Sequence, residues 1–191
     1  MIKINGDLYI VKPGKAIYNK EIIQYASSTV TLIDDGLLIL VDTGLEEDWP
    51  LIKTGIEEAG FHPSEIDVIV NTHLHRDHIG CNNKFKAKKY AHPKEIQRVN
   101  AHEYIPSPRK ISERAFVLET PGHVDGHISI VFKKGKVVMA GDAIPTRNHY
   151  ARRIIPRVHS DAEMAMKSLL KILKIADIIV PGHDEPIKVT R

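Results

Sequence analysis

The sequence has little of what secreted, membrane-spanning or disordered proteins contain. Its 191 residues include one cysteine, Cys81, so an intramolecular disulfide is excluded and a reducing cytoplasm is the expected compartment. No apolar run reaches the roughly eighteen residues of a membrane-spanning helix, and the N-terminus lacks the basic and apolar pattern of a secretion signal. No low-complexity tract divides the chain. These absences favour a cytoplasmic globular protein without membrane association.

The composition fits one ordinary domain spanning residues 1–191. Hydrophobic residues make up 42% and charged residues 27%, and a chain of this length can bury a substantial core. The net charge of +3 is mildly basic. It permits an anionic small-molecule substrate but falls short of indicating nucleic-acid binding.

The strongest functional signal is the stretch from Asn71 to His78, which follows the strand-like run Ile66–Val70. It places three imidazoles and one carboxylate in six positions; these are His73, His75, Asp77 and His78. Two residues apart on an extended chain, the first two histidines point to one side. Imidazole and carboxylate are ligand types that suit zinc and related metals. The alternative is a cluster of solvated surface histidines.

Three later apolar runs also end in a turn residue followed by a ligand-type side chain. They are Ala115–Leu118 before His123, Lys136–Met139 before Asp142, and Asp177–Val180 before His183. If the ends of these strands converge, all the ligand-type side chains meet at one edge, where α/β proteins commonly build their sites.

The predicted elements repeat one order, hairpin–Asp–helix–strand–His, through Asp42 and His73 and again through Asp142 and His183. Its first half contains a strand at Leu8–Val11, strands Thr29–Ile33 and Leu37–Val41, a helix at Trp49–Ala59, a short helix from about His78, a strand at Lys88–Ala91 and a helix from Pro93. Its second half contains strands Ile128–Phe132 and Lys136–Met139 around the turn Lys133–Gly135, a helix capped by Ser160 with apolar positions Met164, Leu169, Leu170 and Leu173, and a strand at Ile178–Val180.

Leu40–Gly44 provides a first motif, and the ligand-type residues His73–His78, His123, Asp142 and His183 follow it in order. Together these motifs resemble the metallo-β-lactamase superfamily of hydrolases, from about Val30 to His183. The full His-x-His-x-Asp-His set looks more like the glyoxalase II and lactonase branches of this superfamily than like true β-lactamases. The resemblance implies an α/β fold, a four-layer α/β/β/α sandwich with metals at one edge of its two sheets.

Carried over from that family, His73, His75 and His123 hold one metal, Asp77, His78 and His183 hold a second, and Asp142 bridges both. Seven ligands exceed one tetrahedral zinc but suit two divalent ions, expected to be zinc with iron or manganese as alternatives. Two cations lower the pKa of a shared water from near 16 towards roughly 7, which provides a bridging hydroxide. Asp77, as the catalytic residue, orients this nucleophile. No Gly-x-Ser-x-Gly elbow occurs, and no serine nucleophile is required.

The predicted reaction is hydrolysis of a small ester, thioester or lactone. The alternatives are a phosphodiesterase or nuclease, and a persulfide dioxygenase with one iron. The missing export signal argues against β-lactam substrates. The chain stops eight residues after His183, without the C-terminal helical region typical of glyoxalase II-like enzymes. Pro145 stands where lactonases place a tyrosine, three residues after the bridging aspartate.

Several residues near the motifs have alternative interpretations. Asp42 is expected to support the loops through hydrogen bonds rather than touch a metal. His127 either supports the ligands or is a satisfied core histidine. Cys81 is expected to be a buried packing thiol. His62, His92 and His102 are expected to be surface residues.

The sequence leaves the roles of two further segments undecided. The arginine-rich segment Arg147–His159 is either a solvated face, a contact in a homo-oligomer, or a substrate lip for a carboxylate or phosphate, with the hydroxyl of Tyr150 contributing there. Ala101–Ser112 carries two prolines and is predicted to be a loop, of the kind that can serve as a lid.

Overall fold

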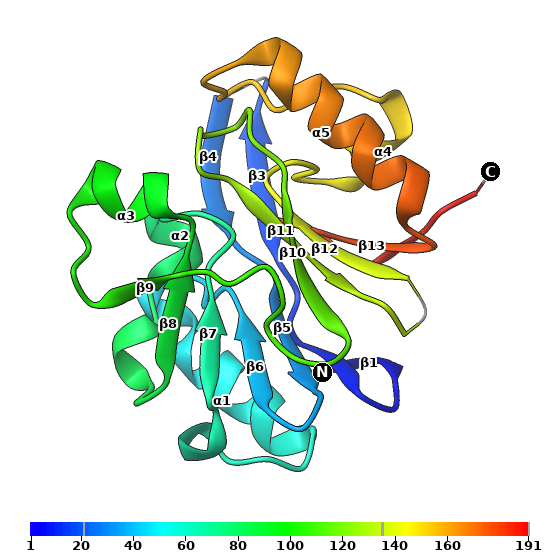
Figure 1. Cartoon of the computed structure of the whole chain (residues 1–191). Coiled ribbons are helices and arrows are strands. Elements are labelled where there is room, and N and C mark those ends of the chain that lie inside the picture. Colours follow the sequence, from blue (N-terminus) through cyan, green and yellow to red (C-terminus); the bar gives the residue numbers. More distant parts are fainter. Residues whose placement is uncertain (21, 135, 191) are drawn as a thin grey trace.

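The fold is a four-layer α/β/β/α sandwich, as the sequence predicted (Figure 1). This computed structural model describes residues 1–20, 22–134 and 136–190. Two sheets face each other across a shared core, and helices cover their outer faces. Among the described residues, no helix has both the length and the apolar character needed to cross a bilayer.

The larger sheet contains the first half of the chain and, among the described residues, has seven strands. Their order is β1 (Ile2–Asn5), β2 (Leu8–Lys12), β5 (Val30–Asp34), β6 (Leu38–Val41), β7 (Val68–Val70), β8 (Lys88–Ala91) and β9 (Tyr104–Pro106). Strands β6 to β9 run parallel to one another. The connecting helices of this half are α1 (Trp49–Glu58), α2 (Arg76–Ile79) and α3 (Pro93–Val99), with 3-10 turns η1 (Glu46–Asp48), η2 (Pro63–Glu65) and η3 (Asn82–Lys84).

The smaller sheet has five strands within the described part of the chain. Their order is β10 (Ala115–Glu119), β11 (Ile128–Phe132), β12 (Val137–Gly141), β13 (Ile178–Pro181) and β14 (Ile187–Lys188). The parallel strands β12 and β13 are joined through α4 (Arg147–Arg152) and α5 (Ala162–Ile175). A separate hairpin of β3 (Lys15–Asn19) and β4 (Ile22–Ser27) extends beyond the larger sheet (Figure 1, blue).

The layers follow from strands that are apolar on both faces. Along β6, Ile39 and Val41 pack into the core between the sheets, whereas Leu38 and Leu40 join Ile52 of α1 in an outer core. Successive side chains of a strand point to opposite faces, so a continuous apolar run requires cover on both sides. Strand β12 does the same in the smaller sheet, between the shared core and α5.

The repeated order predicted from the sequence is confirmed. Strands β6 and β7 are parallel with α1 between them in the chain, and β12 and β13 are parallel with α5 between them. The residues that directly follow these strands are therefore delivered to the same edge of each sheet. Among them are Asp42, His73, Asp142 and His183.

The segment Ala101–Ser112 is not a loop throughout, which corrects the sequence prediction. Strand β9 lies within it and pairs in parallel with β8, while the side chain of Tyr104 is buried. The segment thus extends the larger sheet, and none of its residues lines the cavity described below. It is not a lid.

The start of α5 also differs from the prediction, because Asp161 rather than Ser160 caps it. The Asp161 carboxylate accepts the N–H of Met164 at 2.9 Å, whereas the hydroxyl of Ser160 donates to the carbonyl of Gly122 at 3.1 Å. The side chain of Leu170 is 50% exposed, so it is not a core position.

Helix α2 begins at Arg76, ahead of the predicted start near His78. The predicted turn Lys133–Gly135 includes Gly135, which lies outside the described residues.

Candidate metal centre

Three histidine nitrogens converge where β7 and β10 end. His73 follows β7 and lies with its Nε2 2.9 Å from Nδ1 of His75. His123, in the loop after β10, brings its Nε2 to 3.0 Å from the same nitrogen. These atoms lie within 4.8 Å of one another, close enough to share one ion. The predicted neighbourhood of His73 and His75 is therefore confirmed.

A second group forms beside the first, from α2 and the loop after β13. Asp77 and His78 lie in the first turn of α2, where the backbone leaves the extended conformation. Nε2 of His183 is 3.5 Å from Oδ2 of Asp77, and Nε2 of His78 is 4.0 Å from the same oxygen. These three side chains also lie close enough to hold one ion.

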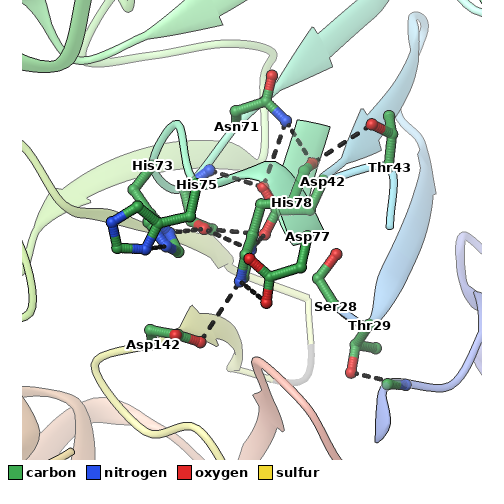
Figure 2. A network of polar contacts seen from close by, with 12 residues as sticks. Ser28, Thr29, Asp42, Thr43, Asn71, His73, His75, Asp77, His78 and Asp142 are labelled. Atoms are coloured by element: carbon green, nitrogen blue, oxygen red, sulfur yellow. Dashed lines mark hydrogen bonds and ion pairs between the residues drawn. The ribbon is translucent and has the colours of Figure 1, made fainter. Parts of the chain in front are cut away.

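Asp142 lies between the two groups and presents one oxygen to each. Figure 2 shows its ion pair with His78. Its Oδ2 is 3.5 Å from Nε2 of His123. Its Oδ1 is 3.0 Å from Nε2 of His183 and 3.5 Å from Nε2 of His78. The structure thus brings together all seven side chains that the sequence singled out as candidate ligands.

The chemistry of these donors fits divalent cations. Nε2 of His78 and Oδ1 of Asp142 are buried and have no hydrogen-bond partner among the described residues. Their near neighbours include each other and Nε2 of His183, and buried polar atoms in folded proteins nearly always form hydrogen bonds, so this cluster without them calls for a ligand. Imidazole nitrogen and carboxylate oxygen together suit zinc, iron or manganese.

Asp42 orients one of the candidate ligands, as the sequence predicted. Its Oδ1 accepts the N–H of Thr72 at 2.8 Å, and its Oδ2 accepts the Thr72 hydroxyl at 2.8 Å. Oδ2 also lies 2.8 Å from Nδ1 of His78. A carboxylate on one ring nitrogen fixes the orientation of the imidazole and leaves the other nitrogen to face Asp142.

His127 holds the backbone of Asp142. Of the two interpretations of His127, the structure therefore favours support of the candidate ligands. Its Nε2 accepts the backbone N–H of Asp142 at 3.0 Å, and its Nδ1 lies 2.9 Å from the Thr120 hydroxyl. Burial lowers the pKa of His127 to about 3, so the ring is neutral and one nitrogen is free to accept. The ring therefore positions the residue that faces both groups.

Glu95 of α3 fixes the backbone between two candidate ligands, a role that the sequence did not reveal. Its fully buried carboxylate accepts the N–H of Leu74 at 3.1 Å, between His73 and His75. Arg98 binds the same carboxylate through two nitrogens, at 2.7 and 3.0 Å. In a sequence, an Arg three residues after a Glu usually indicates a solvent-exposed ion pair on a helix. The Glu95–Arg98 pair differs only because the packing of α3 buries the carboxylate.

A cavity of about 730 Å³ opens onto both groups. His75, Asp77, His123, Asp142 and His183 form its polar part. Its apolar walls come from the β3–β4 hairpin and from the chain around α4; they include Tyr18, Ile22, Ile23, Pro145, Pro156 and Val158. The candidate ligands are therefore reachable by a small molecule that has an apolar part.

The segment Arg147–His159 is split between this cavity and other surfaces. His149 and Arg157 line the cavity, whereas Arg153 lines a separate hollow beside Leu173. The expected role of Tyr150 at the site is wrong, because its hydroxyl accepts the N–H of Thr190 at 3.2 Å and its ring packs beside the outer core of the smaller sheet.

The remaining candidates outside the motifs have structural roles. Cys81 is fully buried, its thiol donates to the carbonyl of Leu45 at 3.1 Å, and burial raises its pKa to about 11. It is a packing thiol, as expected. His62 and His92 accept backbone N–H groups at the starts of η2 and α3, and His102 is exposed.

Comparison with known proteins agrees with this geometry. The family model of the metallo-β-lactamase superfamily matches residues 25–114 and 111–183. A probable metallo-hydrolase of Methanocaldococcus jannaschii is 38% identical over 148 residues, covering 76% of this chain and 70% of the relative. An N-acyl homoserine lactonase of Bacillus cereus is 29% identical over 161 residues, covering 73% and 63%. The crystal structure of a quorum-quenching N-acyl homoserine lactone hydrolase superposes with a TM-score of 0.74 at 22% identity, covering 96% and 94%. The chain belongs to the metallo-β-lactamase superfamily and is a metallo-hydrolase of that family.

Proposed function

We propose that this protein uses two divalent metal ions to hydrolyse a small ester, thioester or lactone. The position of Asp142 carries the proposal, because its two carboxylate oxygens face two separate groups of nitrogen and oxygen donors. A carboxylate that binds a single metal ion requires only one group of neighbouring metal ligands. The buried Oδ1 of Asp142 and Nε2 of His78, neither of which forms a hydrogen bond among the described residues, support the same interpretation.

The seven side chains divide into two sets of ligands. His73, His75 and His123 would hold one ion, Asp77, His78 and His183 the other, and Asp142 would contact both. We expect zinc, with iron or manganese as alternatives. Two cations held by these side chains would polarise a carbonyl oxygen and would lower the pKa of water towards neutral pH.

Asp77 is the side chain that we assign to the nucleophile. It lines the cavity, and its side chain is 23% exposed, whereas that of His78 is fully buried. A carboxylate in this position can accept a hydrogen bond from the attacking water and orient it towards a substrate carbonyl. The backbone N–H of Ser28, which donates to the carbonyl of Asp77 at 3.0 Å, steadies the residue.

His149 is the group that we assign to the substrate oxygen. Lactonases of the family have a tyrosine where this chain has Pro145, so that hydroxyl is missing here. His149, four residues further on, lines the cavity, and its Nδ1 lies 2.8 Å from the Thr146 hydroxyl. Burial lowers its pKa, so the ring is neutral and can form one further hydrogen bond within the cavity.

The cavity walls favour a small acyl substrate over a polymer of phosphodiesters. Ile22 and Ile23 present apolar surface beside the polar groups, and such surface binds an alkyl group rather than a charged backbone. The name of the Bacillus cereus relative points the same way, towards an acylated lactone. We place the reaction in the cytoplasm, because the single cysteine shows no use of disulfides.

The test is a panel of thioester, lactone, β-lactam and phosphodiester substrates, assayed on protein of measured metal content. We expect turnover of at least one carboxylic ester, thioester or lactone, and its loss in Asp142→Asn. Faster turnover of phosphodiesters would favour a nuclease instead. One iron per chain together with oxygen consumption would contradict a hydrolase with two metals.

A further inference from the structure

A second cavity, of about 1120 Å³, adjoins the metal centre. The two cavities share lining residues, including Tyr18 of β3, His149 of α4 and the candidate ligand His183. A molecule whose reacting bond lies at the metal centre can therefore extend into this second space. Apart from these shared residues, the lining of the second cavity has no role in the hydrolysis described above.

Basic side chains from separate segments line this second cavity. Lys15 comes from β3, and Arg147 and Arg152 come from α4 on the other wall. Among the described lining residues the only carboxylate is that of Asp184, and its oxygens accept the N–H groups of Arg147 and Glu185 at 2.9 and 2.8 Å. The cavity therefore has an excess of positive charge.

Two of these cations are available to a ligand. Within the part of the chain that the structure describes, neither Lys15 nor Arg152 forms an ion pair. Arginines on a surface are usually only solvated, but here the cations from two chain segments surround one hollow. An arginine offers a planar pair of donors that matches a phosphate, and a concave site concentrates the field of several cations.

We propose that the substrate carries a phosphorylated group, which this basic cavity binds while the scissile bond lies at the metal centre. The substrate is then an ester or thioester with an apolar acyl part against the β3–β4 hairpin and a phosphate-bearing part between Lys15 and Arg152. This inference rests on the proposed hydrolase and names the class of its substrate.

The test compares two thioesters that share a hexanoyl group, one with coenzyme A and one with uncharged N-acetylcysteamine. On the metal-loaded protein, we expect a higher kcat/KM for the coenzyme A thioester. Arg152→Gln and Lys15→Gln should each lower this value about fivefold, since each removes one charged contact to phosphate, and should leave the uncharged thioester unaffected.

Arg153→Gln is the matched control. It removes the same charge from the neighbouring residue, but Arg153 lines the separate hollow beside Leu173. It should leave both thioesters unaffected. An equal loss for both thioesters in Arg152→Gln, or an equal effect of Arg152→Gln and Arg153→Gln, would overturn the proposal.

Binding of thioethers that cannot be hydrolysed separates this inference from the proposed activity. By titration calorimetry, S-hexyl coenzyme A should bind about tenfold more tightly than S-hexyl-N-acetylcysteamine, and Arg152→Gln but not Arg153→Gln should reduce the difference. If this pattern holds while neither thioester is hydrolysed, thioester hydrolysis is wrong and the basic site stands. Equal affinities for the two thioethers would overturn the basic site, whatever the turnover.

Discussion

Asp142 contacts both groups of candidate ligands, so its charge matters to both. Replacing it by asparagine keeps the shape but removes the negative charge that faces His123 on one side and His183 on the other. For Asp142→Asn we expect fewer than two metal ions per chain by plasma mass spectrometry. Turnover of the best substrate should fall about 100-fold or more, with an unchanged circular dichroism spectrum. Unchanged turnover with two metals still bound would show that the charge of Asp142 is not needed to hold them.

Glu95 provides a test of support from outside the centre. Burial favours its neutral form, but Arg98 and the N–H of Leu74 outweigh burial and lower its pKa below the ordinary 4.5. A lowered folded pKa stabilises the protein above the unfolded pKa, and this stability is lost as the pH falls through the folded value.

Glu95→Gln should therefore reduce the free energy of unfolding at pH 7 by roughly 1–3 kcal/mol, because Arg98 loses its charged partner. The difference from the wild-type protein should shrink as the pH is lowered from about 5 to 3. Urea titrations at each pH measure it. A difference that stays constant with pH would mean that the charge of Glu95 is not what stabilises the His73–His75 segment.

The candidate ligands could be predicted from sequence because each follows an apolar run that forms a strand. The position of His73 after β7 and of Asp142 after β12 follows from the end of a buried strand. Glu95 could not be predicted, because its role depends on how α3 packs against Leu74. The direction of Tyr150 likewise depends on packing that no local pattern contains.

At the scale of elements, the junction between β4 and β5 ties the two ligand loops together. The N–H of Ser28 donates to the carbonyl of Asp77 at 3.0 Å, and the N–H of Thr29 donates to the carbonyl of Gly182 at 2.6 Å, next to His183. Two adjacent backbone groups thus hold loops from both sheets. The β3–β4 hairpin that precedes this junction is anchored beside the metal centre, and its apolar side chains form part of the cavity.

The apolar side chains of the β3–β4 hairpin lead to a prediction about the preferred length of the acyl group. Ile23 lines the cavity and is 45% exposed, so an alkyl chain can cover it. Ile23→Ser should raise KM for a hexanoyl substrate about three- to tenfold, while an acetyl substrate, too short to reach it, should be unaffected. Ile17→Ser is the control, because Ile17 is 43% exposed on the same hairpin but does not line the cavity. Equal effects of the two substitutions would show that only the stability of the hairpin had changed.

The wholly buried strands could be predicted from the sequence, whereas the largely exposed β3 could not. Strand β6 is wholly buried and therefore reads as a continuous apolar run. Strand β3 is largely exposed and mixes Lys15, Tyr18 and Asn19, which gives no periodic signal. Helix α4 has six residues, too few for a helical period to show.

At the scale of the whole molecule, two similar halves deliver their residues to one shared edge. Asp42 and His73 follow parallel strands of the larger sheet, and Asp142 and His183 follow parallel strands of the smaller sheet. The repeated order along the chain made this architecture predictable. Which loops wall the cavity was not predictable, because this depends on how the sheets face each other. One domain over residues 1–191 and a homo-oligomeric contact stay predictions.

The proposed activity requires two metal ions held by one chain, and measuring their number together with turnover tests it most directly. We expect plasma mass spectrometry of the active protein to give two divalent ions per chain. Turnover should disappear after exhaustive chelation and return in proportion to added zinc, iron or manganese. A single ion per chain at full activity, or full turnover after all metal has been removed, would contradict it.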